Sequence, residues 1–267
     1  MRAMKRRNNK KNVLIPLFIT LQLPVATAQK NIPPPNRDKD VLRAVFYNME
    51  NFFHPENDSL KDDEKYTQSG VLYWNEHRYK KKAIQHYKTL IHIGGWSPPD
   101  IINVCEIENK KVMQELKNKT PLKKFNYKII HKESPDKRGI DVAMIYRKKT
   151  LRIIDKKWHK VDFEKDYRTT RDILYVKGIK IRTNDTINIF VNHWPSRYGG
   201  KLKTEPKRIK AAKILRKKVD SLNEMNKNAK ILIMGDFNDT HRDKSIKKVL
   251  SATTDTSKDN KELYDLT

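Results

Sequence analysis

The sequence contains a single cysteine, Cys105, among 267 residues, so the chain cannot form an internal disulfide. No cluster of residues has the spacing of a zinc site either. Cys105 ends the apolar run IINVC, and we interpret it as a small buried hydrophobic residue rather than a nucleophile. A fold without disulfides depends on its core, and 37% hydrophobic residues in a chain of this length can form one large domain.

Three motifs with familiar chemistry are also missing. The sequence has no glycine-rich loop of the Walker type, no G-x-S-x-G turn and no G-x-G-x-x-G turn. Nucleotide-driven transfer, acyl transfer from a serine and dinucleotide redox chemistry therefore have no support. There is no internal repeat, and lysine is the only residue type that is strongly enriched.

Negative charge is scarce relative to positive charge. The chain has 58 Lys and Arg residues against 32 Asp and Glu residues, which gives a formal net charge of +26. The lysines are spread along the chain, so a solvated lysine-rich surface explains them as well as attraction to a polyanion does. Both interpretations stay open at the level of sequence.

Residues 1–28 have the three parts of a secretory signal peptide. A basic start, MRAMKRRNNKKN, precedes the apolar run VLIPLFITLQLPVATA, which ends in an A-x-A cleavage pattern. An uncleaved membrane anchor is the weaker alternative, because the run contains two prolines and is shorter than the about 20 residues of a bilayer span. We expect cleavage after Ala28, a proline-rich linker over residues 29–40, and an exported domain over residues 41–267. It would be periplasmic or extracellular, without a stable membrane span.

The rest of the chain alternates between strand and helix patterns. Two helices are predicted, from Glu76 to Ile91 and from Lys207 to Leu222, with Pro206 in a first-turn position of the second. Strands rich in Val, Ile, Tyr and Phe are predicted over residues 41–48, 100–106, 125–131, 140–146, 172–181, 186–193 and 230–236. The span RTNDT is typical of a hairpin turn between two of them. This pattern predicts an α/β fold in which two mixed β-sheets pack together with helices outside.

Four of these strands end abruptly in polar residues. The polar residues are Asn48 with Glu50, then Glu106, then His193, and finally Asp236 with Asn238. Each has an ordinary structural explanation on its own, because Asn and Asp cap turns and a lone His is more often structural than catalytic. Four such ends in one chain favour a shared rim, where rigid strands would hold carboxylates, amides and an imidazole together.

Such a rim predicts a particular kind of chemistry. Carboxylate oxygens with amide support suit a hard cation such as Mg²⁺ or Mn²⁺, which keeps several waters and engages phosphate. Since the other reaction classes have no support, the pattern points to metal-assisted hydrolysis of a phosphoester.

The motifs YNMENFF, INVCEIEN, RGIDVAMIYR, VNHWPSR and MGDFND, in this order, resemble the endonuclease/exonuclease/phosphatase superfamily. The superfamily includes pancreatic-type deoxyribonucleases, apurinic-site endonucleases, sphingomyelinases and inositol-polyphosphate phosphatases. The resemblance runs from about Val41 to Asp239 and implies a four-layered α/β sandwich with its active site on one rim. It also implies hydrolysis of phosphoester bonds with a divalent metal, Mg²⁺ or Mn²⁺.

The resemblance implies a role for each residue at the strand ends. Glu106 corresponds to the acid that binds the divalent ion. Asn48 corresponds to an asparagine that holds the metal–water network and the phosphate, and His193 to a histidine that contacts the phosphoryl group. Asp236 corresponds to the residue that orients or activates water, with Asn238 as its partner in binding phosphoryl oxygens.

Three more charged residues complete the predicted site. Glu50 lies where some members of the superfamily place a second acid, so we assign it to the metal. Arg138 and Arg197 lie next to the motif strands, and a guanidinium fork fits phosphate oxygens in pairs. We assign both to substrate binding, with an ordinary surface arginine as the alternative.

Three neighbouring residues have more than one interpretation. Trp194 could stack on a base or sugar, but packing beside a proline is favoured. Asp141 could orient His193 or a metal-bound water, or it could pair with Arg138. Asp239 is interpreted as a turn residue.

The end of the sequence departs from the superfamily pattern. Members normally finish with a further acid and an Asp-His or similar pair on a late strand. Here only 28 residues follow Asp239 (267 − 239 = 28), and they contain no such pair. We therefore expect a domain that lacks its closing strands, is incomplete at its C-terminal end and is poorly active as it stands.

The substrate is left open by the sequence. A nuclease that acts on DNA or RNA suits the positive charge, since a basic groove attracts polyanions. The alternatives are a phosphatase or phosphodiesterase that acts on small phosphate esters, and an inactive module that only binds polyanions. We expect a monomer in each case.

Overall fold

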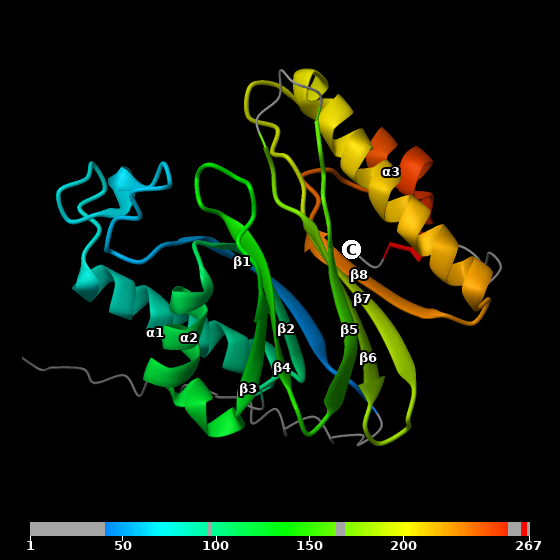
Figure 1. Cartoon of the computed structure of the whole chain (residues 1–267), viewed down its shortest axis with the longest axis horizontal. Helices are drawn as coiled ribbons and strands as arrows, with labels where there is room; N and C mark the ends of the chain where they lie inside the picture. Colours follow the sequence, from blue (N-terminus) through cyan, green and yellow to red (C-terminus); the bar gives the residue numbers. More distant parts are fainter. Residues whose placement is uncertain (1–40, 96–97, 164–168, 256–262, 266–267) are drawn as a thin grey trace, which may run out of the picture. The chain divides into compact units, whose positions relative to one another are not determined.

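A computed structural model describes residues 41–95, 98–163, 169–255 and 263–265 of the chain (Figure 1). These residues belong to the larger of two compact units, Pro34–Thr267. The predicted signal peptide and its linker lie outside the described residues. Within the described ranges, no helix is both long and apolar enough to cross a membrane.

Two mixed sheets are present, as the sequence predicts. The first has the strand order β1-β2-β4-β3 and consists of β1 (Ala44–Phe52), β2 (Ile101–Ile107), β3 (Tyr127–His131) and β4 (Asp141–Arg147). The second has the order β5-β6-β7-β8 and consists of β5 (Leu151–His159), β6 (Ile173–Lys180), β7 (Thr186–His193) and β8 (Lys230–Asp236). In each sheet one pair is parallel, β1 with β2 and β7 with β8, and the other pairs are antiparallel.

The two sheets pack face to face around a shared core. Ile101 and Val142 of the first sheet belong to one buried cluster with Leu174 and Val191 of the second. β2, β4, β6 and β7 are buried on both faces, which explains why they appear in the sequence as nearly continuous apolar runs.

Helices cover the outer face of each sheet, so the layers run helix, sheet, sheet, helix (Figure 1). The first sheet is covered by α1 (Glu76–Ile93) and α2 (Lys110–Lys119). The second is covered by α3 (Lys201–Met225) and the short π-helix η3 (Ser245–Leu250). The predicted four-layered α/β sandwich is therefore confirmed.

The helix α3 begins earlier than the sequence suggests. A start near Lys207 was predicted, with Pro206 in the first turn, but the helix runs from Lys201 and contains Pro206. A proline in this position cannot donate a hydrogen bond to the preceding turn. The buried guanidinium of Arg208 holds the first turns of this helix together, since it donates to the backbone oxygen of Lys201 at 3.0 Å and to Thr204 Oγ1 at 2.7 Å.

Sequence patterns missed two larger elements, β5 and α2. β5 lies at the edge of its sheet, and its exposed residues include Lys156 and Lys157, so its apolar content is low. α2 has only ten residues, begins after the capping side chain of Asn109 and buries Val112, Met113 and Leu116. The short elements η1 (Glu64–Tyr66), η2 (Pro121–Phe125), β9 (Ala252–Thr253) and β10 (Leu263–Tyr264) were also not predicted. The expected lack of closing strands stays a prediction.

Candidate functional site

The four polar strand ends meet at one rim of the sandwich. β1 and β2 run parallel, with Asn48 opposite Cys105, so Asn48 and Glu106 lie at the same end of the first sheet. β7 and β8 also run parallel, with His193 opposite Asp236. Since parallel strands finish at the same edge, each sheet brings two of the four ends together, and the contact of Asn48 with Asp236 joins the two sheets.

Asn48 connects the two sheets through its side-chain amide. Its Nδ2 atom donates to Glu106 Oε1 at 3.2 Å and to Asp236 Oδ2 at 3.1 Å. Its Oδ1 atom accepts a hydrogen bond from the backbone N–H of Glu50 at 2.8 Å. One amide therefore holds two carboxylates that lie 130 residues apart in the sequence (236 − 106 = 130).

His193 faces this pair of acids. Its Nε2 atom lies 3.6 Å from Glu106 Oε1, while its Nδ1 atom is buried and has no hydrogen-bond partner among the described residues. Burial holds the pKa of His193 well below its usual range, and the nearby charges of Arg171 and Arg138 lower it further. His193 is therefore neutral at pH 7, with a ring nitrogen that lacks a partner.

Local backbone distortions direct the acids toward each other. The pairing of β2 with β4 shifts between Cys105 and Ile107, and Glu106 lies in this bulge with a φ of 57°. The bulge turns Glu106 out of the regular ladder, and its Oε2 atom accepts from the backbone N–H of Asn51 at 3.0 Å. Glu50 and Asn51 also have positive φ angles, at a second irregularity between β1 and β2. Backbone strain of this kind is concentrated at functional sites.

The end of β8 depends on a glycine. A Cβ atom at Gly235 would lie 2.4 Å from the backbone oxygen of Asn192 and 2.6 Å from its Cβ, too close for any side chain. The close approach sets Asp236 opposite His193. Beyond the strand, the backbone N–H of Asn238 donates to Asp236 Oδ1 at 3.0 Å, and the Asn238 amide donates to the backbone oxygen of Trp194 at 3.1 Å.

The donor set fits a divalent metal. Carboxylates of Glu106 and Asp236 supply negative charge, with the Asn48 amide between them, which is the oxygen-rich chemistry that Mg²⁺ and Mn²⁺ prefer. Ligand atoms of Cys105, His193 and Asp236 also lie within 4.8 Å of one another. Burial raises the pKa of the Cys105 thiol well above its usual range, and Asp236 and Glu106 raise it further, so this thiol stays protonated and is a poor ligand.

Arg138 lies beside the cluster and is held by an acid that sequence analysis did not identify. Its Nε and Nη2 atoms donate to Asp136 Oδ1 and Oδ2 at 3.1 and 3.0 Å, and half of its side chain is exposed. Asp136 also accepts from the fully buried Arg171 at 3.0 Å, and Arg171 donates to the backbone oxygen of Trp194 at 2.8 Å. The sequence RTTRD gave no apolar context to mark Arg171 as buried.

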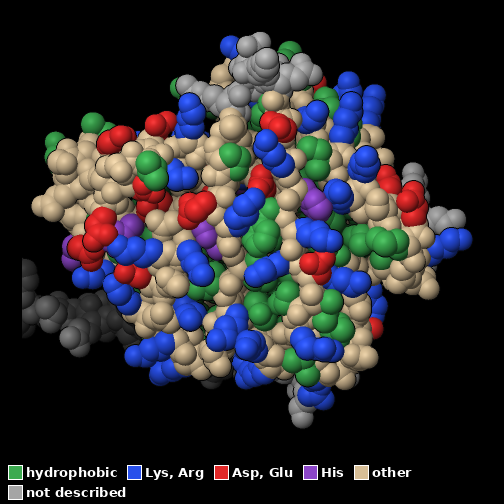
Figure 2. Space-filling view, in the orientation of Figure 1, with side chains coloured by type: hydrophobic (Ala, Val, Ile, Leu, Met, Phe, Trp, Pro, Cys, Tyr) green, Lys and Arg blue, Asp and Glu red, His purple; other side chains and the backbone are tan. Residues whose placement is uncertain are grey.

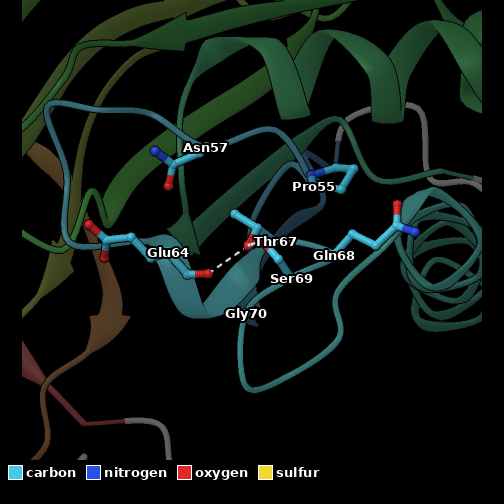
Figure 3. Close-up of a pocket in the computed structure, with 7 residues that line it drawn as sticks. All are labelled: Pro55, Asn57, Glu64, Thr67, Gln68, Ser69 and Gly70. Carbon is cyan, nitrogen blue, oxygen red and sulfur yellow. Dashed lines mark hydrogen bonds between the residues drawn. The ribbon is translucent and has the colours of Figure 1, made fainter.

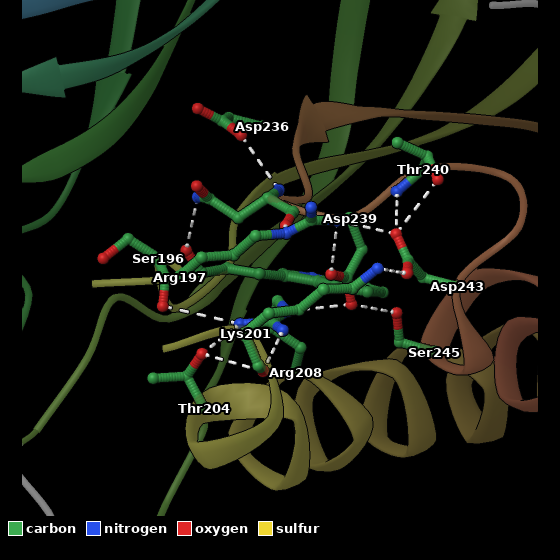
Figure 4. A network of polar contacts seen from close by, with 12 residues as sticks. Ser196, Arg197, Lys201, Thr204, Arg208, Asp236, Asp239, Thr240, Asp243 and Ser245 are labelled. Carbon is green, nitrogen blue, oxygen red and sulfur yellow. Dashed lines mark hydrogen bonds and ion pairs between the residues drawn. The ribbon is translucent and has the colours of Figure 1, made fainter. Parts of the chain in front are cut away.

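Arg197 belongs to a separate network of ion pairs behind the site (Figure 4). Its Nε atom donates to the backbone oxygen of Asn238 at 2.7 Å, and its Nη2 atom contacts Asp239 at 3.0 Å and Asp243 at 2.6 Å. Asp239 also pairs with the buried Arg208 at 2.8 Å. The structure therefore places Arg197 where it braces the loop after β8, outside the Asn48 cluster.

Four other sequence predictions have outcomes in the structure. Asp239 is a buried member of the Arg197 network and not a simple turn residue. Asp141 contacts neither His193 nor Arg138, because it accepts from His131 at 2.7 Å and from the backbone of Ser134 at 2.8 Å. Packing is confirmed for Trp194, which is 1% exposed and lies edge-on to Phe237. Cys105 is buried, as expected.

Glu50 lies at the margin of the cluster. Its side chain is exposed, and its backbone oxygen accepts a hydrogen bond from Lys82. Among the described contacts, its carboxylate does not reach Glu106 or Asp236, so its assignment to the metal stays a prediction.

Comparison with known proteins identifies the family. The sequence profile of the endonuclease/exonuclease/phosphatase family matches residues 43–267. Among curated proteins, no sequence matches this chain.

Solved structures share the fold at low sequence identity. The human nocturnin catalytic domain with bound sulfate is 14% identical (TM-score 0.53), with 77% of this chain and 68% of that chain covered. A mannosyl-6-phosphatase from Bacteroides thetaiotaomicron is 17% identical (TM-score 0.52), with 79% and 70% covered. TDP2 from D. rerio, complexed with a single-strand DNA product, is 14% identical (TM-score 0.50), with 78% and 64% covered.

Proposed function

Because the chain belongs to the endonuclease/exonuclease/phosphatase family of phosphoesterases, we propose that it hydrolyses phosphodiester bonds of nucleic acids with the help of a divalent cation. The observation that carries this proposal is the Asn48 amide, which holds Glu106 and Asp236 together beside His193, whose Nε2 atom lies 3.6 Å from Glu106 Oε1. Two carboxylates held close together without a basic partner would gain most from a bound cation.

Mg²⁺ or Mn²⁺ would be held by Glu106, with Asp236 and Asn48 around it. When bound, such a cation neutralises phosphoryl oxygens and lowers the pKa of water. We propose only a supporting role for Glu50, whose exposed carboxylate adds negative charge at the margin of the cluster.

Side chains of the protein would orient the water, accept its proton and bind the phosphoryl oxygens. Asp236 would orient the attacking water and accept its proton. The neutral His193 and the amide of Asn238 would contact the phosphoryl oxygens, and Arg138 would offer its exposed guanidinium as a further contact. Positioned groups of this kind each contribute typically about 10²- to 10⁴-fold in rate.

The positive charge supports nucleic acid as the substrate. Lys and Arg side chains cover much of the face drawn in Figure 2, and the net charge favours the approach of polyanions, since it is +26 for the whole sequence and 26 − 6 = +20 without residues 1–28. We also propose that the chain is exported, on the signal-peptide pattern of its first 28 residues. Mass spectrometry of the protein from its producing cells should find Gln29 at the N-terminus, and cytosolic protein that keeps Met1 would contradict export.

A hollow on the loop that follows β1 favours a second candidate, the hydrolysis of a small phosphate ester. It measures about 730 Å³ and is lined by Pro55, Gly70 and Glu64 together with neutral polar side chains (Figure 3). The neutral members include Asn57, Thr67, Gln68 and Ser69, which can bond the hydroxyls of a sugar. This lining suits a phosphosugar better than a long polyanion.

A substrate panel distinguishes these candidates. The purified chain is incubated with plasmid DNA, single-stranded DNA, RNA, nucleotides and phosphosugars, with Mg²⁺, with Mn²⁺ and with a chelator. Metal-dependent cleavage of a polynucleotide that His193→Ala removes, and that the surface control Glu76→Gln keeps, would support the proposal. Cleavage of phosphosugars alone would favour the second candidate, and binding of nucleic acid without turnover would indicate a binding module.

A further inference from the structure

Four exposed lysines form one face of α3. Lys203, Lys210 and Lys217 repeat every seven residues, and Lys213 lies between the last two, so all four project from the same side of the helix. We call these four residues the lysine face. It extends over 15 residues, and its first and last members are separated by about 21 Å of helix at about 1.5 Å per residue.

The lysine face keeps its positive charge. Half of the residues from 201 to 218 are Lys or Arg, and Glu205 is the only acid among them. None of the four lysines forms an ion pair with another described residue. Other lysines do find acids, such as Lys119 with Glu115 and Lys230 with Asp185. A row of ammonium groups without ion pairs is suited to a partner with repeated negative charges.

Ion pairs join the helix that carries this face to the loop after β8. Arg208 pairs with Asp239 at 2.8 Å, and Lys201 pairs with Asp243 at 2.5 Å (Figure 4). Asp239 directly follows Asn238, which contacts Asp236. The lysine face therefore extends, as one rigid element, from the edge of the proposed active site.

An exposed aromatic side chain lies on the loop that connects β7 to α3. Tyr198 is 93% exposed, which is unusual for a tyrosine, and it follows Arg197, which is bonded to the backbone of Asn238. Gly199 and Gly200 then turn the chain with positive φ angles into the first residue of α3. A basic surface with an exposed aromatic ring is the combination that binds single strands, because bases stack on the ring while the backbone follows the charges.

We propose that Tyr198 and the lysine face bind a single-stranded nucleic acid on one side of the scissile phosphate. The inference rests on the proposed function only in assuming that the bound strand continues into the cluster of Asn48, Glu106 and Asp236. The surface contacts bases by stacking and phosphates by charge, so it would bind DNA and RNA strands with little preference for sequence.

The test measures binding without catalysis. Fluorescence anisotropy follows a labelled 20-nucleotide single strand, as DNA or as RNA, in the presence of a chelator and over a range of salt concentrations. The variant Lys203→Gln, Lys210→Gln, Lys213→Gln, Lys217→Gln is compared with wild type. The matched control replaces four exposed lysines of the opposite helical layer, Lys81, Lys88, Lys123 and Lys124, by Gln. Circular dichroism melts verify that both variants fold.

The salt dependence gives the sharpest result. Each phosphate contact on a single strand contributes about 0.7 to the slope of log K against log salt, so loss of the lysine face should reduce the slope by roughly 2 to 3. The control should change it by less than one contact. Equal losses in the two variants would show that charge acts without a defined surface, and would overturn the proposal.

Tyr198 provides an independent readout. Tyr198→Ala should weaken binding of the strand about tenfold, while Tyr198→Phe, which keeps the ring, should retain it. Wild-type affinity in Tyr198→Ala, or tighter binding of the wild-type protein to anionic lipid vesicles than to the strand, would overturn the proposal. If the wild-type chain binds the strand through this surface but cleaves no phosphodiester with Mg²⁺ or Mn²⁺, the proposed function fails and this inference stands.

Discussion

Two groups of acids lie next to each other at the end of β8, and the structure holds them in opposite ways. Glu106 and Asp236 are contacted by amides, and no Lys or Arg forms an ion pair with either within the part of the chain that is described. Asp239 and Asp243, only a few residues further on, each contact two basic side chains at distances of 2.5 to 3.0 Å.

The difference distinguishes the acids of the candidate site, Glu106 and Asp236, from the acids that brace the loop after β8, Asp239 and Asp243. Although burial opposes ionisation of Asp243, hydrogen bonds from Lys201 and Thr240 hold its pKa well below the usual range. The charges of Asp239 and Asp243 are therefore compensated by basic side chains. Glu106 and Asp236 share one amide and face a neutral imidazole, so their charge is available for a cation. Acidic residues therefore lack basic partners in one group and brace the loop after β8 in the other.

The largest expected effect on stability comes from breaking the ion pair between Arg208 and Asp239. Arg208→Met would leave Asp239 buried with less compensation, and removing one partner of a buried pair costs about 3–5 kcal/mol. The melting temperature should fall by roughly 6–20 °C. The control is Lys80→Ala, which breaks an exposed pair with Glu76 and should cost about 0.5 kcal/mol or less. Similar melting temperatures for the two variants would contradict the distinction between the groups.

The same kind of change in the site should affect activity instead of stability. Glu106→Gln removes a charge with little change in shape, so we expect at least about a 100-fold loss of metal-dependent turnover, the upper end for residues that only orient ligands. Calorimetry with Mn²⁺ should show weakened binding, while the melting temperature stays within a few degrees of wild type. Asp220→Asn, an exposed acid on α3, serves as the control. Wild-type Mn²⁺ affinity in Glu106→Gln would remove Glu106 from the site.

A third acid, Glu108, shows how burial alone changes the pKa of a carboxyl group and the pH dependence of stability. Burial raises the pKa of Glu108 to about 7, partly offset by a hydrogen bond from the His54 backbone. Because the folded pKa lies above the unfolded value, its contribution to stability is complete at low pH and is lost as pH rises toward about 7.

Glu108→Gln should therefore remove the part of the pH dependence that arises between the unfolded pKa and about 7. At pH 8 the variant should be more stable than wild type by on the order of 2 kcal/mol. Urea unfolding at pH 5 and pH 8 measures the difference, and an unchanged difference would show that Glu108 is not strained by its surroundings.

The smallest effect concerns backbone strain. Glu50 and Tyr73 both have positive φ angles and exposed side chains, but only Glu50 lies at the site. A non-glycine residue in this conformation costs about 1–2 kcal/mol, whereas glycine loses about 0.5–1 kcal/mol more entropy on folding. Each residue changed to glycine should therefore stabilise the fold by about 0.5 kcal/mol.

Only Glu50→Gly should also reduce Mn²⁺ affinity, by a factor of about three, since one unit charge near a surface has a modest effect. A tenfold or larger loss would identify Glu50 as a direct ligand, and no loss would exclude it.

The sequence predicted the parts of this molecule that follow simple periodic patterns. The buried strands of both sheets were found, because they are covered on both faces and are therefore nearly continuous in apolar residues. The abrupt polar ends of four strands also predicted that Asn48, Glu106, His193 and Asp236 would lie at one rim. Their chemical roles stay predictions.

What the sequence did not predict depends on contacts between distant segments. Arg171 and Asp136 lie in loops of mixed polarity, and only the folded chain shows that they are buried together. Arg197 and Asp239 were assigned to phosphate and to a turn because nothing local indicates that they pair with each other or that Arg208 reaches Asp239 from α3. Edge strand β5 was missed because its exposed face dilutes the apolar signal.

Gly235 has a consequence for any attempt to move this site to another protein. The letters GDFND are short enough to copy into many strand ends, but the glycine works here because the backbone of Asn192 approaches it closely. A transplanted motif would bring the acids without the neighbouring strand that fixes their position. The smallest unit that could be moved to another protein is therefore the pair of parallel strands β7 and β8. A graft of the motif alone should have the right sequence but no activity.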